Sequence, residues 1–191
     1  MYPEYALING KEYKIDTSFK TALKCFEIVD DKSITDYERA LAIIYLLFDF
    51  IPQENIQLFL EKAKIFLQCG KKENNESEEN QDIDFVQDRK YINASFMSDY
   101  HIDLSKDDLH FWQFIEYLEG LTENSSLNRL RNLRNYDLSE IKDDKERSKI
   151  AEAQKKVAIK KKKVKLDINQ TKSLNAFCDA MGIKKEGKNE W

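Results

Sequence analysis

The chain contains little of the two residues that punctuate loops, with only five glycines and two prolines among 191 residues. Because tight turns depend on glycine and proline, a chain with so few of them has few tight turns. A β-sandwich or barrel, which needs many turns, is therefore disfavoured. Charged residues make up 35% of the sequence and hydrophobic residues 41%, which is typical of amphipathic helices with solvated outer faces.

The sequence also lacks a long apolar run and a paired cysteine pattern. Its longest apolar run, residues 40–48, ends at Asp49, whereas a membrane-spanning helix needs about 20 residues. The three cysteines, Cys25, Cys69 and Cys178, are odd in number and show no spacing of the CxxC kind. We therefore expect a cytoplasmic protein with reduced thiols, without a secretory leader or membrane span.

Charge is distributed unevenly, although the formal net charge is only -4. Residues 145–191 carry 14 basic and six acidic side chains, whereas residues 1–144 carry 17 basic and 29 acidic ones. Parts of opposite charge attract each other or different partners. We interpret residues 1–144 as a helical domain with an N-terminal hairpin and a polar loop at 71–82, and residues 145–191 as a charged helix with a flexible tail.

The order of the patterns predicts a mostly α-helical bundle of about six or seven helices behind a short β-hairpin. Asn9-Gly10, between the strand-like runs 5–8 and 11–15, is typical of a type I′ turn. Since an isolated two-stranded ribbon is marginal in water, the hairpin must lie on the helices or add to a neighbour's sheet. Residues 71–82 contain no apolar side chain, so we expect a mobile loop there.

Apolar residues at helical spacing predict three helices before this loop. The first is expected to begin at Thr17 or Ser18 and to run to about Asp30. The second begins with a capping box at residues 35–38, Thr-Asp-Tyr-Glu. The third is expected to hold Pro52 in its first turn, where no amide hydrogen is missed, and to end near Gly70.

Residues 84–121 hold eight of the 22 aromatic residues and predict a pair of helices. The first helix of the pair is expected where four apolar residues recur at spacings of 7, 4 and 4, namely Phe85, Ile92, Phe96 and Tyr100. The second is expected to begin at Ser105 as N-cap, with Leu104 and Leu109 as a hydrophobic staple, and to end near Gly120.

Two further helices are predicted after the aromatic block, over residues 126–135 and 143–165. The second has only a narrow apolar stripe, Ile150, Val157 and Val164, so it lies on a partner or frays. Seven lysines fall within residues 155–165. They suit phosphate contacts, but no interleaved aromatic residue is there to stack on bases, so a solvated face or an acidic partner is favoured over nucleic acid.

The motifs of catalysis, cofactor binding and metal binding are absent from the sequence, so we expect a protein that is not an enzyme and holds no cofactor or metal. His101 and His110, the only histidines, lack a nucleophile or further ligands at suitable spacing and are interpreted as structural or surface residues. The candidate binding residues are the aromatic Phe111, Trp112 and Tyr117 and the basic Lys160, Lys161, Lys162 and Lys163. For the aromatic residues a place in the core is the simpler interpretation, and a groove for a partner helix is the alternative.

Four segments of the aromatic block resemble the bacteriophage Gp15 family, namely residues 91–96, 100–104, 109–114 and 118–121. The flanks agree as well, with Asn9-Gly10 and Phe19 before the block and residues 130–134 and 145–156 after it, so that the resemblance covers residues 5 to about 165. Two positions depart from the family pattern. His101 stands where glycine is usual, which puts a left-handed turn there in question, and Phe111 stands where tryptophan is usual.

The resemblance implies a tail-module protein of Gram-positive siphophages or prophages that acts in the bacterial host cytoplasm. It implies a tail assembly chaperone, which coats the tape-measure protein and gives way to tail-tube protein. Self-association is a further expectation. Two alternatives stay open: a structural component of the finished tail, and a nucleic-acid or regulatory protein that binds through the basic helix.

Overall fold

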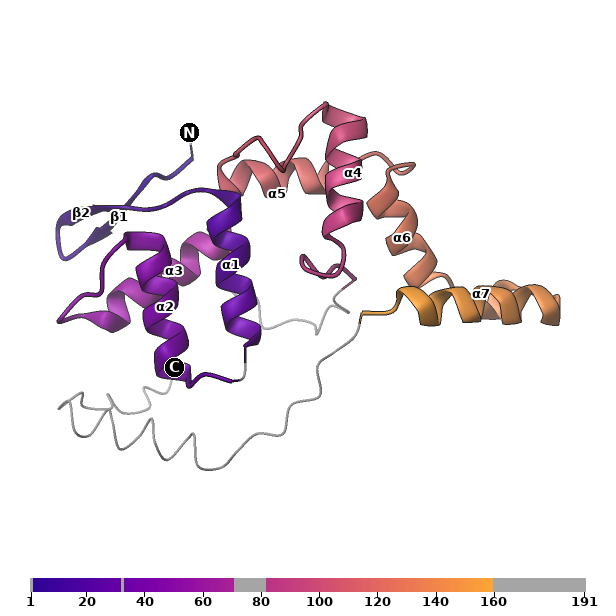
Figure 1. Cartoon of the computed structure of the whole chain (residues 1–191), viewed down its shortest axis with the longest axis horizontal. Coiled ribbons are helices and arrows are strands. Elements are labelled where there is room, and N and C mark those ends of the chain that lie inside the picture. The colour runs from indigo at the N-terminus through magenta and orange to yellow at the C-terminus, as the bar shows by residue number, and fades with distance from the viewer. Residues whose placement is uncertain (1, 32, 71–81, 160–191) are drawn as a thin grey trace.

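The computed structural model describes residues 2–31, 33–70 and 82–159. Over these residues the chain forms a two-stranded hairpin, seven α-helices and one short 3-10 helix (Figure 1). The predicted fold class, a mostly α-helical bundle behind an N-terminal hairpin, is confirmed. Residues 71–81 of the predicted polar loop and the predicted tail beyond residue 159 lie outside the described residues.

The hairpin and three helices form the N-terminal half. Its elements are β1 Tyr5–Ile8, β2 Lys11–Lys14, α1 Phe19–Asp30, α2 Asp36–Phe48 and α3 Ile56–Leu67. Asn9 and Gly10 both have positive φ, 49° and 76°, as a type I′ turn requires. Helix α2 lies between α1 and α3, and β1 contacts α3, so the hairpin rests on the helices that follow it.

The predicted starts of the first two helices are confirmed. The Ser18 hydroxyl accepts a hydrogen bond from the Lys20 amide at 3.1 Å and caps α1. In the capping box of α2, the Glu38 amide donates to the Thr35 hydroxyl at 3.2 Å, and the Thr35 amide donates to the Glu38 carboxylate at 2.7 Å. These two contacts satisfy amides that the first turn of a helix leaves without a partner.

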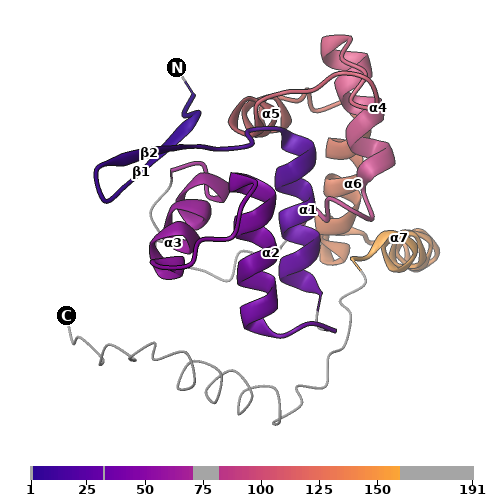
Figure 2. The same ribbon diagram turned by 60° about the vertical axis from the view of Figure 1, so that its left-hand side comes forward.

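Four α-helices and one short 3-10 helix form the C-terminal half of the described chain. Its elements are α4 Arg89–Tyr100, α5 Phe111–Glu119, α6 Ser126–Asn135, the 3-10 helix η1 Leu138–Glu140 and α7 Asp144–Val157. Helix α5 packs on α1, and α4 packs on α5 and α6. Helix α7 packs on α6 and η1 and extends away from the bundle, at the end opposite the hairpin (Figures 1 and 2).

Three stacked phenylalanine rings join the two halves. The Phe114 ring of α5 lies 4.8 Å from the Phe19 ring of α1 and 5.2 Å from the Phe96 ring of α4, with interplanar angles of 13° and 18°. The three side chains are at most 4% exposed. Each ring comes from a different helix, so the stack fixes the relative positions of α1, α4 and α5.

The predicted helix start at Ser105 is wrong, because α5 begins at Phe111. Residues 103–107 instead form a tight turn in which Asp103 accepts hydrogen bonds from the amide and hydroxyl of Ser105. The backbone at 109–111 then pairs with residues 17–19 of the N-terminal half. A backbone committed to an extended pairing cannot also make helical hydrogen bonds.

Three other predicted boundaries also differ from the structure. Helix α3 begins at Ile56 rather than around Pro52, which lies buried in the preceding loop. Helix α4 begins at Arg89, so that Phe85 lies in a turn held by the Asp84 carboxylate, which accepts from the amides of residues 86 and 87. Helix α7 ends at Val157 and not at 165. The predicted bounds of α6, residues 126–135, are confirmed.

A buried ion pair ties the start of α4 to α6. The Asp88 carboxylate, 2% exposed, accepts two hydrogen bonds of 2.7 Å from the Arg134 guanidinium, 9% exposed. Arg134 also donates to the Val157 carbonyl at 2.7 Å and to the Asp82 carbonyl at 2.8 Å. The hydrogen bonds that Arg134 donates to the Asp88 carboxylate hold the pKa of the guanidinium above its usual range. This one guanidinium holds the ends of three segments together.

His101 ends α4 in the left-handed conformation, with φ 61°. Its amide donates to the Met97 carbonyl, and the Ile102 amide donates to the Phe96 carbonyl, which is the hydrogen-bond pattern of a left-handed helix end. The left-handed turn is therefore kept at this position, although it carries histidine. A side chain with a Cβ atom strains this conformation by about 1 kcal/mol.

We predict that His101→Gly raises the free energy of unfolding by a few tenths to about 1 kcal/mol. Glycine removes the strain at positive φ, and the greater conformational entropy that it gives the unfolded chain offsets only part of this gain. Urea unfolding followed by circular dichroism measures the change. His101→Ala keeps the Cβ atom and serves as the control without such a gain. Equal stability of the glycine and alanine variants would contradict the strain.

We predict that Asp88→Ala destabilises the protein by about 3–5 kcal/mol, because it leaves the Arg134 guanidinium buried without its carboxylate. The double variant Asp88→Leu/Arg134→Met removes both charges and is expected to recover part of this loss, because it still lacks the hydrogen bonds of Arg134 to the Val157 and Asp82 carbonyls. The measurement is urea unfolding of the single and double variants as a cycle. A single variant with wild-type stability would show that the pair is solvated rather than buried.

Candidate functional site

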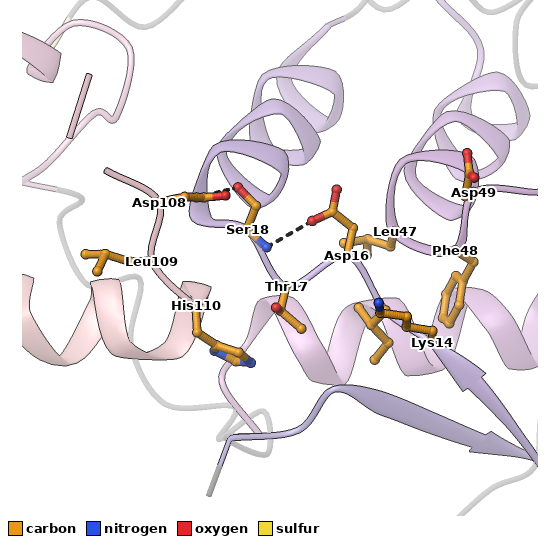
Figure 3. Close-up of a pocket in the computed structure, with 11 residues that line it drawn as sticks. Lys14, Asp16, Thr17, Ser18, Leu47, Phe48, Asp49, Asp108, Leu109 and His110 are labelled. Atoms are coloured by element: carbon orange, nitrogen blue, oxygen red, sulfur yellow. Dashed lines mark hydrogen bonds between the residues drawn. The ribbon is translucent and has the colours of Figure 1, made fainter. Parts of the chain in front are cut away.

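A short backbone pairing brings the N-termini of α1 and α5 together. The Phe19 amide donates to the Leu109 carbonyl at 2.9 Å, and the Phe111 amide donates to the Thr17 carbonyl at 2.7 Å. An open cleft of about 620 Å³ lies beside this pairing, between the end of β2, the end of α2 and the loop before α5 (Figure 3). We call this place, residues 14–18, 47–49 and 108–110, the junction cleft.

The carboxylates of the junction cleft that form hydrogen bonds serve the start of α1. Asp16 accepts from the Ser18 amide at 3.0 Å and from the Thr21 hydroxyl at 2.8 Å. Asp108 accepts from the Ser18 hydroxyl at 2.7 Å, as the dashed line in Figure 3 shows. Negative charge at a helix N-terminus is favourable because the unpaired amides there carry partial positive charge. These contacts are those of helix capping.

The imidazole of His110 uses both ring nitrogens to hold the chain. Nδ1 accepts from the Trp112 amide at 3.1 Å and so caps α5, and Nε2 lies 3.0 Å from the Pro3 carbonyl. The neutral ring with its proton on Nε2 satisfies both contacts. The ring also stacks on Tyr2, with centroids 4.9 Å apart. His110 is thus a structural residue, as the sequence suggested.

The described residues include neither a reactive thiol at Cys25 nor a group of metal ligands. Cys25 is fully buried in α1, and burial, with the charge of Asp16 added, raises the pKa of its thiol to about 12. A thiol of such a pKa stays protonated and weakly nucleophilic near neutral pH. Cys69 is half-buried after the end of α3. In the part of the chain that the structure describes, no three His, Cys, Asp or Glu side chains form a metal-binding group.

A second concavity, of about 370 Å³, lies between α1 and α4, and we call it the α1–α4 groove. Its apolar floor comes from four segments of the chain and consists of Phe19, Leu23, Phe85, Ile92, Leu104 and Phe114. Lys20, Lys24 and Arg89 line it as well, together with the polar Asn93 and Ser105. Among the described residues that line this groove there is no carboxylate, and the Glu27 carboxylate lies 3.7 Å from the Arg89 guanidinium. An apolar floor with cations around it suits an apolar side chain that is followed by acidic groups.

The aromatic residues that the sequence suggested for partner binding differ in burial, although Phe111 and Trp112 both lie near the Phe66 ring. Phe111 is only 1% exposed and packs in the core, as the simpler interpretation expected. Trp112 is half-buried, and its indole nitrogen donates to the Phe66 carbonyl at 2.8 Å. Tyr117 stacks on Tyr100 at 4.8 Å. Lys160, Lys161, Lys162 and Lys163 lie outside the described residues.

The sequence did not predict the residues of the α1–α4 groove as a binding site. Lys20 and Lys24 stand four residues apart on the helix that carries Phe19 and Leu23, which is a visible signal. The spacing of these lysines does not indicate, however, that Arg89 and Leu104 line the same groove. The contact between α1 and α4 depends on the phenylalanine stack, which only the folded chain shows.

Comparison with known proteins decides the family. The model of the family described as Bacteriophage Gp15 protein matches residues 3–159. The chain belongs to the bacteriophage Gp15 family. No curated protein and no solved structure shows a significant match.

The match to the Gp15 family spans the hairpin and all seven α-helices described by the structure. The resembling segments contribute heavily to the core, through Phe96, Leu104, Phe111, Phe114, Leu118 and Leu121. These residues of the family signature therefore contribute to the packing of the core. Among the described helices of this Gp15-family protein, none is both long and apolar enough to cross a membrane.

We predict that His110→Ala lowers the free energy of unfolding by about 1 kcal/mol or more, because it removes the N-cap of α5 and the contact with Pro3. His110→Asn loses the Pro3 contact but keeps a capping oxygen, so it is expected to be the more stable of the two variants. Thermal unfolding followed by circular dichroism compares them. The same melting temperature for both would contradict the capping role.

Proposed function

We propose that this Gp15-family protein is a tail assembly chaperone that binds the tape-measure protein in the cytoplasm of the bacterial host. It is not an enzyme, and it releases its client to the tail-tube protein during assembly. The α1–α4 groove supports the proposal, because the described residues that line it are mostly apolar side chains and cations, and no carboxylate is among them. Membership of a phage family supports the same setting.

The proposed client is an amphipathic helix with acidic residues beside its apolar face. Helical proteins commonly hold such helices in apolar grooves, where a few anchor side chains supply most of the affinity. The cations around the groove add specificity and speed the encounter. Residues 1–144 carry 17 basic and 29 acidic side chains and are therefore acidic as a whole. The groove, which is lined by cations, thus has a local charge opposite in sign to the net charge of the domain that contains it.

The hydrogen bonds in the junction cleft favour a binding protein over an enzyme. Two of its three carboxylates, those of Asp16 and Asp108, accept hydrogen bonds from groups at the start of α1, and both ring nitrogens of His110 contact backbone groups. A general base must be free to take a proton from a substrate. Side chains that are committed to capping do not meet this requirement.

We predict that co-expression with the tape-measure protein of the same phage yields a soluble complex that co-purifies with this protein. Lys24→Glu/Arg89→Glu places two carboxylates at the groove and is expected to weaken the complex about tenfold or more, which corresponds to about 1.4 kcal/mol. The matched control Lys149→Glu/Lys155→Glu makes the same change of charge on exposed positions of α7. Pull-down with titrated client measures the difference.

The outcomes separate the function from its site. An insoluble tape-measure protein without co-purification would contradict the chaperone. A complex that both double variants weaken equally, or not at all, would keep the chaperone and contradict the groove. Mass spectrometry of purified virions distinguishes the alternative of a structural tail component, because a chaperone is expected to be missing from finished particles.

A further inference from the structure

The hairpin buries one face and exposes the other. Along β1, Ala6 and Ile8 are 5% and 4% exposed, whereas Tyr5 and Leu7 are 54% and 59% exposed. On the inner face, Tyr13 of β2 packs its ring against Phe59 of α3. The outer face therefore presents two large hydrophobic side chains on neighbouring alternate positions of a single strand.

The register of the hairpin shows that β1 has an open edge. The Ile15 amide donates to the Glu4 carbonyl at 2.8 Å, so residues 4 and 15 form a hydrogen-bonded pair. Because such pairs alternate in an antiparallel ladder, Tyr5 and Leu7 occupy the intervening positions. Their amides and carbonyls are directed away from β2, and they bond to no described residue outside the hairpin.

The two edges of the hairpin differ in their protection against pairing. Natural edge strands are usually blunted by charges, proline or bulges. Strand β2 carries Lys11, Glu12 and Lys14, whereas β1, Tyr5–Ile8, carries neither a charge nor a proline. The β1 edge is thus the neutral and apolar edge of the hairpin. It lacks the features that usually prevent an edge strand from pairing with a further strand.

We propose that β1 pairs with β1 of a second copy of this chain, to form a four-stranded antiparallel sheet across a two-fold axis. The sequence of the edge is self-complementary. With Ala6 facing its own copy on the axis, Tyr5 lies opposite Leu7 of the second copy, and Leu7 lies opposite Tyr5 of the second copy. An aromatic side chain opposite a large aliphatic one is a favourable cross-strand pair.

This pairing also satisfies the open backbone groups. Tyr5 and Leu7 of each copy exchange both amide–carbonyl hydrogen bonds with the other copy, which makes four bonds at the interface. The exposed Tyr5 and Leu7 side chains come together on one face of the new sheet. The four-stranded sheet also overcomes the marginal stability of an isolated two-stranded ribbon.

Leu7→Pro tests this edge selectively. Proline at position 7 removes an amide that points away from β2, so the hairpin keeps its own hydrogen bonds while the interface loses two. Leu7→Lys is a second variant, which keeps the backbone and places a charge on the edge. Glu12→Pro is the matched control, because it makes the equivalent change on the β2 edge. Circular dichroism verifies that each variant is folded.

Light scattering coupled to size-exclusion chromatography of the full chain, over a dilution series, gives the oligomeric state. We expect a dimer that dissociates on dilution, a dissociation constant at least about tenfold higher for Leu7→Pro and Leu7→Lys, and no change for Glu12→Pro. A wild-type monomer at all concentrations would overturn the proposal. A dimer that only Glu12→Pro disrupts, or that all folded variants retain, would overturn it as well.

Discussion

The stack of Phe19, Phe114 and Phe96 is the contact on which the arrangement of this protein depends. The three rings come from α1, α5 and α4, and the central ring is fully buried. Since α5 follows α4 in the chain but packs on α1, the stack joins the N-terminal and C-terminal halves into one core. The α1–α4 groove exists because Phe114 holds these two helices on either side of its own ring.

Polar contacts at the margins of this core fix the ends of the helices. The backbone pairing of residues 17–19 with residues 109–111 starts α1 and α5 at the same place. At the other side, Arg134 binds Asp88 and the last carbonyl of α7. Apolar packing is not directional, whereas hydrogen bonds are, so these contacts set the register that the phenylalanine stack alone leaves open.

The surfaces that remain after the core is formed have different characters. The junction cleft is lined by groups that already serve helix ends, whereas the α1–α4 groove offers an apolar floor with cations beside it. The outer face of β1 offers Tyr5 and Leu7 with an open backbone edge. The first of these surfaces is the proposed site for a client helix, and the second is the proposed site for a strand of a second copy.

The sequence by itself determined the features that rest on contacts between neighbouring residues. The Asn9-Gly10 turn, the start of α1 at Thr17 or Ser18 and the capping box at Thr35 were predicted correctly, because each depends on a hydrogen bond or a dihedral preference within a few residues. The family signature was readable for the same reason. Only the tertiary structure decided the start of α5 at Phe111, since the competing backbone pairing comes from a segment about 90 residues away.

The tertiary structure also decided which aromatic residues are available to a partner. Phe111 and Trp112 are neighbours in the sequence, yet one is fully enclosed and the other is half-buried against α3. Local spacing specifies one face of a helix, but it does not specify what covers that face. The α1–α4 groove collects side chains from four segments of the chain, and such a convergence is set by the packing of the whole core and not by any one segment.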